Sequence, residues 1–243
     1  MALGPVDPPP SQWLRAAELP RALHGAAALA GAWRSLPRAR IGGGRPVMLL
    51  PGLVNSDRSL SLLRRYLRDL GYDARGWGLG RNLGVRATGI EAERLIARVR
   101  AFAQERGAPV SLVGVSLGGI MARIVAHRAP QAVARVITVA SPYAGHPRGT
   151  NVWRAFEWLT GERVDDVTVQ ARLAEARRPL SVPATAIWSA SDGLVGGRLC
   201  HQPGEPGLTV VRVSSGHVGV QWRPEVLRAV AAALARGQSS RSA

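Results

Sequence analysis

Residues 110–128 read VSLVGVSLGGIMARIVAHR and carry the clearest fold signal of the chain. Residues 110–115 form an apolar run, which is typical of a central parallel strand covered on both faces. Residues 117–128 have the pattern of a helix, and Pro130 ends it. Ser116 stands between the two in a Gly-x-Ser-x-Gly pattern. A serine in a tight turn between a buried strand and a helix is typical of a catalytic nucleophile.

The glycines around Ser116 have a physical purpose. A sharp strand-to-helix turn strains the serine backbone, and Gly114 and Gly118 remove the Cβ atoms that would keep the strand and the helix apart. The turn exposes the Ser116 hydroxyl at the N-terminus of the helix, where the helix dipole favours developing negative charge. A hydroxyl nucleophile needs a base to accept its proton, so another part of the chain must supply one.

The alternation of strand, turn and helix recurs on both sides of this stretch. It predicts an α/β fold with an open, mostly parallel sheet flanked by helices. The expected strands are residues 47–50, 72–77, 110–115, 133–140, 184–188 and 208–213, and the expected helices are residues 60–70, 90–106, 117–128 and a last one that starts near Pro224. Residues 142–182 interrupt the alternation, and their pattern predicts a small helical lid insertion in two pieces.

An N-terminal extension and a short tail flank the alternating region. Residues 1–44 are rich in proline and alanine and are expected to be partly helical. Within them we expect disorder over residues 1–10, a helical pattern over 11–36 that Pro20 breaks, and a glycine linker at 42–44. Residues 45–237 are expected to form the α/β domain, and residues 238–243 a disordered tail.

Candidate partners for Ser116 follow two later strands. In open α/β sheets the site forms at the carboxyl ends of the strands, and after a serine turn of this type the acid and then the histidine follow in chain order. Asp192 comes soon after the strand at 184–188, and His217 soon after the strand at 208–213. The sequence therefore predicts Asp192 as the acid and His217 as the base.

Alternatives exist for all three roles. The other acids are Asp165 and Asp166, which have the position of helix-start residues, and the other base is His201. The other nucleophile is Cys200, around which nothing resembles a strand-to-helix turn. We interpret His127 as a helix-surface residue and His146 as a loop residue.

An oxyanion hole would complete such a site. One backbone N–H comes from the residue after the nucleophile, here Leu117, and the second from the loop after the first core strand. That loop contains Pro51 and Gly52, and Leu53 after the glycine is the expected donor. Taken alone, the Pro-Gly pair would indicate only a turn.

Four short segments carry a family resemblance. They are LLPGL at 49–53, GVSLGG at 114–119, SDGLV at 191–195 and SGHVG at 215–219. On these segments residues 45–236 resemble the α/β-hydrolase superfamily, and more narrowly its compact bacterial lipase and esterase members that lack the first strands of the full sheet. The resemblance implies Ser116 as nucleophile, His217 as base and Asp192 as orienting acid, with the N–H groups of Leu53 and Leu117 as oxyanion donors. One departure is Pro51, where many lipases have a histidine.

The implied activity is hydrolysis of carboxylic esters, from small molecules or lipids, through an acyl-enzyme and without a metal or organic cofactor. The expected substrate-binding residues are the aromatic side chains of the insertion, namely Tyr143, Trp153, Phe156 and Trp158. On a helix Trp153 and Phe156 share a face, whereas Trp158 lies about 140° around from Trp153. These aromatics could instead pack a small flap without a ligand. Other possible functions are a thioesterase, an acyltransferase, a peptidase or a non-catalytic protein that binds anionic surfaces or nucleic acid.

The charge balance is unusual. All 32 basic residues are arginine and only 16 residues are acidic, so the net charge is +16. The arginines are spread along the chain, which favours a solvated basic surface over a specific nucleic-acid site and predicts attraction to anionic membranes. The 46% of hydrophobic residues excludes a disordered chain, the single cysteine excludes an internal disulfide, and no apolar run is long enough for a transmembrane helix. Without a recognisable signal peptide, the expected location is the cytoplasm, with possible peripheral membrane attachment, and the oligomeric state is left open.

Overall fold

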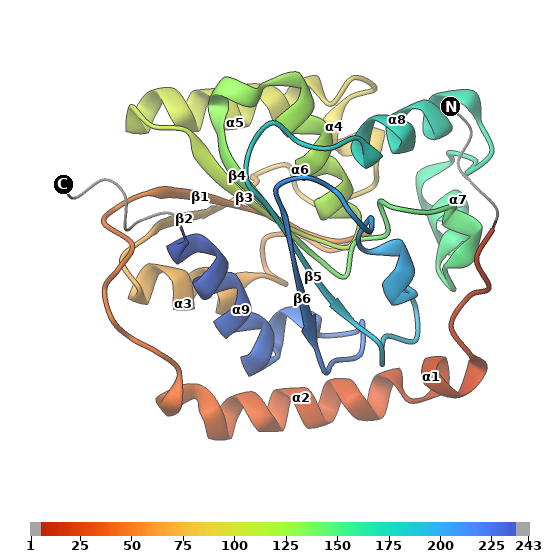
Figure 1. Ribbon diagram of the computed structural model, residues 1–243, viewed down its shortest axis with the longest axis horizontal. Helices are drawn as coiled ribbons and strands as arrows, with labels where there is room; N and C mark the ends of the chain where they lie inside the picture. Colours follow the sequence, from red (N-terminus) through yellow and green to blue (C-terminus); the bar gives the residue numbers. More distant parts are fainter. Residues whose placement is uncertain (1–5, 237–243) are drawn as a thin grey trace.

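The computed structural model describes residues 6–236, and their centre is a six-stranded sheet (Figure 1). Its strand order is β2-β1-β3-β4-β5-β6, and all five pairings are parallel. The strands are β1 (Pro46–Leu50), β2 (Asp73–Gly76), β3 (Val110–Val115), β4 (Val133–Val139), β5 (Ala184–Ser189) and β6 (Leu208–Val213). The prediction of an open parallel α/β sheet is confirmed.

The apolar strands lie where the sheet is covered on both faces. Every residue of β1 and β3 is buried, whereas β6 at the sheet edge has no fully buried residue. On one face α3 (Ser61–Asp69) and α9 (Pro224–Ala235) contribute Leu63, Leu67 and Val230 to the larger core cluster. On the other face α5 (Glu93–Arg106) and α6 (Leu117–Arg128) pack against Met48 and Leu112 (Figure 1). The sheet therefore forms the middle of three layers.

Shorter helices occupy the connections. The four-residue helix α4 (Val85–Thr88) lies in the glycine-rich segment between β2 and α5, where only a loop was expected. The 3₁₀ turns are η2 (Pro130–Ala132), η3 (Pro147–Gly149), η4 (Gly197–Leu199) and η5 (Val220–Trp222). No helix in the described part of the chain has the length and apolarity that crossing a membrane requires.

The N-terminal extension differs from its prediction. It forms α1 (Gln12–Ala16), α2 (Glu18–Ala32) and η1 (Trp33–Ser35), so the helical pattern breaks at Ala17 and not at Pro20. Pro20 is the third residue of α2, where the backbone N–H of an ordinary residue would have no partner inside the helix. A proline is tolerated there because it removes no helical hydrogen bond.

Residues 6–10, which were expected to be disordered, have contacts with the rest of the chain. The Asn151 side-chain amide donates a hydrogen bond of 2.9 Å to the Pro10 carbonyl. The Asp7 carbonyl oxygen lies 3.0 Å from the position that a Cβ on Gly149 would take. The expectation for residues 1–5 and for the tail at 238–243 falls outside the described residues.

A long connection separates β4 from β5, and we call residues 140–183 the β4–β5 insertion. It holds η3, α7 (Trp153–Thr160) and α8 (Val167–Arg177), so the two helical pieces that the sequence predicted are present. An antiparallel bridge between Thr150 and Val195 ties the insertion to the loop after β5. The insertion therefore lies next to the carboxyl ends of β4 and β5.

Candidate active site

Ser116 has the strained backbone that the turn requires, with φ of 52° and ψ of −120°. The glycines on either side of it have no room for a side chain. A Cβ on Gly114 would lie 2.3 Å from the Gly118 carbonyl oxygen, and one on Gly118 would lie 2.3 Å from the Leu50 carbonyl oxygen. The close approach of β3, α6 and β1 thus explains why glycine stands at both positions.

Three side chains from three loops form a hydrogen-bonded chain. The His217 Nε2 atom lies 3.1 Å from Ser116 Oγ, and His217 Nδ1 lies 2.8 Å from Asp192 Oδ2. Ser116 follows β3, Asp192 follows β5 and His217 follows β6. The structure therefore brings together the three residues that the sequence singled out, at the carboxyl ends of the strands.

The Asp192 carboxylate is held in one orientation by backbone donors. Its Oδ1 atom accepts hydrogen bonds from the N–H groups of Leu194 at 2.9 Å and Val195 at 2.7 Å. Only 2% of Asp192 is exposed. The remaining oxygen, Oδ2, is therefore free to face His217, as an acid that orients a histidine must.

The surroundings of His217 set its proton affinity. Burial lowers its pKa, but the charge and hydrogen bond of Asp192, together with the charge of Glu18, raise it, and the pKa lies above the ordinary histidine value. A neutral imidazole with a raised pKa is a stronger base. The arrangement thus fits His217 for accepting the Ser116 proton.

The loop after β1 passes close to Ser116. A Cβ on Gly52 would lie 3.3 Å from Ser116 Cβ, and Leu53 and Leu117 both line the space in front of the serine. Among the described residues, no backbone acceptor takes a hydrogen bond from the N–H of Leu53 or of Leu117. Both N–H groups are available to a developing oxyanion, as an oxyanion hole requires.

Asn82 holds this loop in place, and sequence reasoning did not select it. The side chain is fully buried, and its amide donates a hydrogen bond of 2.7 Å to the Pro51 carbonyl. The Asn82 backbone also accepts from the Val54 N–H and donates to the Asn55 carbonyl, both at 2.8 Å. A polar residue in a glycine-rich loop was the only signal that could have pointed to it.

Ser189 is a second residue that sequence reasoning missed. Its buried hydroxyl accepts hydrogen bonds of 3.0 Å from the N–H groups of Ser191 and Ser215. It therefore joins the loop that carries Asp192 to the loop that carries His217. Its place as the last residue of β5 was the available signal.

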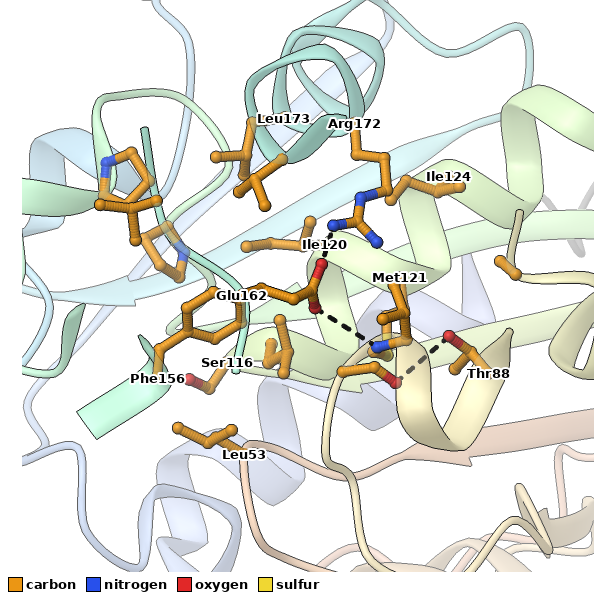
Figure 2. Close-up of a pocket in the computed structure, with 18 of the residues that line it drawn as sticks. Leu53, Thr88, Ser116, Ile120, Met121, Ile124, Phe156, Glu162, Arg172 and Leu173 are labelled. Carbon is orange, nitrogen blue, oxygen red and sulfur yellow. Dashed lines mark hydrogen bonds and ion pairs between the residues drawn. The ribbon is translucent and has the colours of Figure 1, made fainter. Parts of the chain in front are cut away.

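A pocket opens beside Ser116, between α6 and the β4–β5 insertion (Figure 2). Its walls are mainly apolar, and they include Leu53, Ile120, Met121, Ile124, Trp153, Phe156, Val164, Val169 and Leu173. Figure 2 shows Phe156 beside Ser116 at one end, with Glu162 and Arg172 facing each other further along the wall. The Glu162 carboxylate pairs with the Arg172 guanidinium, so the charges of both are compensated. The pocket can therefore hold an apolar group of a molecule whose reacting carbon lies next to the Ser116 hydroxyl.

The pocket contains only two of the four aromatic residues expected to bind substrate. Trp153 and Phe156 line it, whereas Tyr143 and Trp158 do not. Tyr143 is fully buried, its hydroxyl donates to Glu205 at 3.2 Å, and the Arg123 guanidinium lies 3.8 Å from its ring centre. Trp158 is 83% exposed because it lies on the opposite side of α7. Helical spacing had separated Trp158 from the other two, but could not tell which side faced the pocket.

The alternative site residues lie elsewhere. Cys200 is buried, and burial raises the pKa of its thiol well above the ordinary value, so a thiolate is disfavoured. The His201 ring packs against Trp188 at an angle of 46°, with 5.2 Å between ring centres. Asp165 pairs with Arg148 at the surface, and Asp166 is the residue before α8, as expected for a helix start. No group of three or more metal-ligating side chains is present among residues 6–236.

A profile of the family described as serine aminopeptidase, S33, matches residues 47–203 of this chain. The chain is an α/β hydrolase of the serine aminopeptidase S33 family. No curated protein matches the sequence of this hydrolase.

Solved structures share the fold of the hydrolase at low sequence identity. A membrane phospholipase A, described as a bacterial virulence factor, is 17% identical with a TM-score of 0.59, over 90% of this chain and 93% of that chain. The monoacylglycerol lipase of Paleococcus ferrophilus is 16% identical with a TM-score of 0.58, over 79% and 96%. The lipase BlEst2 of Bacillus licheniformis is 18% identical with a TM-score of 0.57, over 79% and 92%. The α/β-hydrolase resemblance drawn from the sequence is therefore confirmed.

Proposed function

We propose that this hydrolase cleaves carboxylic esters through an acyl-enzyme formed on Ser116. The observation that carries the proposal is the hydrogen-bonded chain from Ser116 through His217 to Asp192 at the end of an apolar pocket. A serine hydroxyl with a base at 3.1 Å has the geometry that proton transfer needs. The lipase and phospholipase names among the structural neighbours agree with an ester substrate.

The first half of the reaction acylates the serine. Ser116 Oγ attacks the carbonyl carbon while His217 Nε2 accepts its proton, and Asp192 keeps the second proton of the imidazole on Nδ1. The N–H groups of Leu53 and Leu117 stabilise the tetrahedral oxyanion. The intermediate collapses, the C–O bond of the ester breaks, and the alcohol leaves with the proton that His217 returns.

The second half regenerates the enzyme. Water attacks the acyl carbonyl as His217 accepts one of its protons, and the same N–H groups stabilise the second oxyanion. The intermediate releases the carboxylic acid, and the proton returns to Ser116. Every step uses groups that the chain itself provides.

The pocket supports an apolar acyl or alcohol group as the main specificity element. Ile120, Val164 and Leu173 are each less than one-tenth exposed and line its walls. Each methylene of the substrate that moves from water into contact with these walls contributes about 0.8 kcal/mol to the binding free energy. In this proposal the β4–β5 insertion acts as the lid over the site, because Trp153, Phe156 and Val169 all belong to it.

The family description names an aminopeptidase, so peptide hydrolysis is the second candidate. An aminopeptidase must bind the positively charged amino group of its substrate. The carboxylate in the pocket wall belongs to Glu162, and its charge is already paired with Arg172. The pocket therefore supports an uncharged ester more than a peptide N-terminus.

A substrate panel tests the proposal. The purified protein is assayed on p-nitrophenyl esters from acetate to dodecanoate, on matched thioesters and on aminoacyl p-nitroanilides. We expect turnover of esters, a rise in kcat/KM with chain length until the pocket is full, and no turnover with Ser116→Ala. Faster hydrolysis of the anilides, or esterase activity in Ser116→Ala within tenfold of wild type, would contradict it.

A further inference from the structure

The N-terminal extension reaches the catalytic loops through a buried carboxylate. Glu18 is the first residue of α2, and only 4% of it is exposed. Its Oε1 atom accepts a hydrogen bond of 2.6 Å from the Gly193 N–H, and its Oε2 atom accepts one of 2.8 Å from the Val218 N–H. Gly193 follows Asp192 directly, and Val218 follows His217 directly.

From this geometry we infer that Glu18 is a positioning residue for His217 and Asp192, and that α1 and α2 form part of the active site. The inference rests on the proposed function. One carboxylate spans the loop after β5 and the loop after β6, so the distance between the acid and the base depends on a residue far away in sequence. The family match covers residues 47–203, so Glu18 lies outside it.

The fit around Glu18 is close. A Cβ on Gly216 would lie 2.7 Å from Glu18 Oε2, and a Cβ on Gly193 would lie 2.3 Å from the Leu14 carbonyl oxygen. Glycine at these two positions lets α1 and α2 lie directly on the backbone of the catalytic loops. Small residues are expected where two backbones approach each other this closely.

Further hydrogen bonds fasten the same contact. Arg21, one turn after Glu18, donates from Nη1 to the Ser191 carbonyl at 2.8 Å, and Asn151 joins the carbonyls of Pro10 and Gly193 at 2.9 Å and 2.8 Å. Arg21 therefore ties α2 to the segment around Asp192, and Asn151 of the insertion bridges residue Pro10 of the extension and the same segment. The extension holds this segment at several points.

Glu18 also acts on His217 through its charge. The charged groups that face the imidazole are Asp192 and Glu18, and both raise its pKa. Arg21 and Arg223 lie further out, on the carbonyls of Ser191 and Ser214. Removing the Glu18 charge should therefore lower the pKa of His217 while leaving the Asp192 hydrogen bond as its main partner.

The test compares three full-length variants with wild type. Glu18→Gln keeps the shape of the side chain, but its single carbonyl oxygen can accept only one of the two N–H groups in this orientation. Glu18→Asp keeps the charge on a shorter stem. Glu105→Gln is the matched control, because it removes one carboxylate from a side chain 55% exposed on α5.

We expect Glu18→Gln to lower kcat about tenfold with KM unchanged, since Glu18 does not line the pocket and a misplacement of about 1 Å can cost ~100-fold. The acid limb of its pH–rate profile should move to lower pH. In Glu18→Asp the acid limb should stay closer to its wild-type position than in Glu18→Gln, and Glu105→Gln should match wild type in kcat and in pH profile. An unchanged kcat and pH profile in Glu18→Gln would overturn the inference, as would a rise in KM alone.

An NMR titration of the His217 imidazole separates this inference from the proposed function. It needs no substrate, so a wild-type protein without esterase activity would refute the function while the pKa difference between wild type and Glu18→Gln still reports on Glu18. We expect a lower His217 pKa in Glu18→Gln and an unchanged one in Glu105→Gln. If both Glu18 variants fail to melt cooperatively, Glu18 serves folding, and the positioning role is refuted.

Discussion

Replacing Asp192 with asparagine tests the role of the acid without changing its shape. In the protein, Oδ1 accepts two backbone N–H groups and Oδ2 faces His217 Nδ1. The carbonyl oxygen of an asparagine must take the Oδ1 position, because its NH₂ group cannot accept the Leu194 and Val195 N–H groups. The NH₂ group then faces His217 Nδ1.

The consequence is a change of tautomer. Nδ1 of His217 becomes an acceptor for the new NH₂ group, so the ring proton moves to Nε2, which faces Ser116 Oγ at 3.1 Å. A protonated Nε2 cannot accept the serine proton. For a triad this costs about 10⁴ in kcat, which corresponds to ~5.4 kcal/mol at 1.36 kcal/mol per factor of ten.

The assay measures kcat for p-nitrophenyl butyrate with thermal melting of the same samples. Asp165→Asn is the control, because Asp165 is the alternative acid and pairs with Arg148 at the surface. We expect Asp192→Asn to lose about four orders of magnitude in kcat and Asp165→Asn to lose none. A loss below tenfold in Asp192→Asn would show that another group orients His217.

Three further predictions concern the pocket, the base and the serine turn. Phe156→Ala should lower kcat/KM for hexanoate esters more than for acetate esters, because Phe156 lines the pocket. The control is Trp158→Ala, which should change neither value because the Trp158 side chain on the same helix is 83% exposed; equal losses on both esters in Phe156→Ala would contradict a pocket role. The pKa of His217 is raised and only the neutral ring accepts a proton, so kcat/KM should fall as the pH drops through a midpoint above 6.5. A midpoint below 6.5 would contradict this. Gly118→Ala should lower Tm by several degrees or prevent folding, since its Cβ would lie 2.3 Å from the Leu50 carbonyl oxygen. Gly31→Ala in α2, where a Cβ would meet nothing within 4 Å apart from the neighbouring backbone of its own helix, should keep or raise Tm, and equal melting curves would refute the steric argument.

The sheet could be predicted from local patterns because each strand carries its own signal. The buried run at 110–115 and the helix at 117–128 have the predicted bounds in the structure. Ser116, Asp192 and His217 each follow a parallel strand, so the sequence could place all three at the carboxyl ends of the sheet. The extension forms helices, as its sequence pattern indicated. The expected break at Pro20 is wrong, because a proline in the first turn of a helix does not interrupt it.

The parts that the sequence could not predict depend on contacts between distant segments. Glu18 lies in an alanine-rich segment without any motif, and only the folded chain brings it to Gly193 and Val218. Tyr143 is an aromatic residue at the start of the insertion, and in the folded chain it contacts both partners of the Arg123–Glu205 ion pair, which are 2.6 Å apart. Neither partner of that pair is close to Tyr143 in sequence.

Labelling with a fluorophosphonate shows whether Ser116 is an activated nucleophile, since the reagent forms a phosphonyl ester only with an activated serine. Mass spectrometry of the digested protein identifies the modified residue among all the serines of the chain. We expect one adduct on Ser116 in the wild type, and none there when His217 is replaced with alanine. Labelling of another serine, or equal labelling of Ser116 without His217, would contradict it.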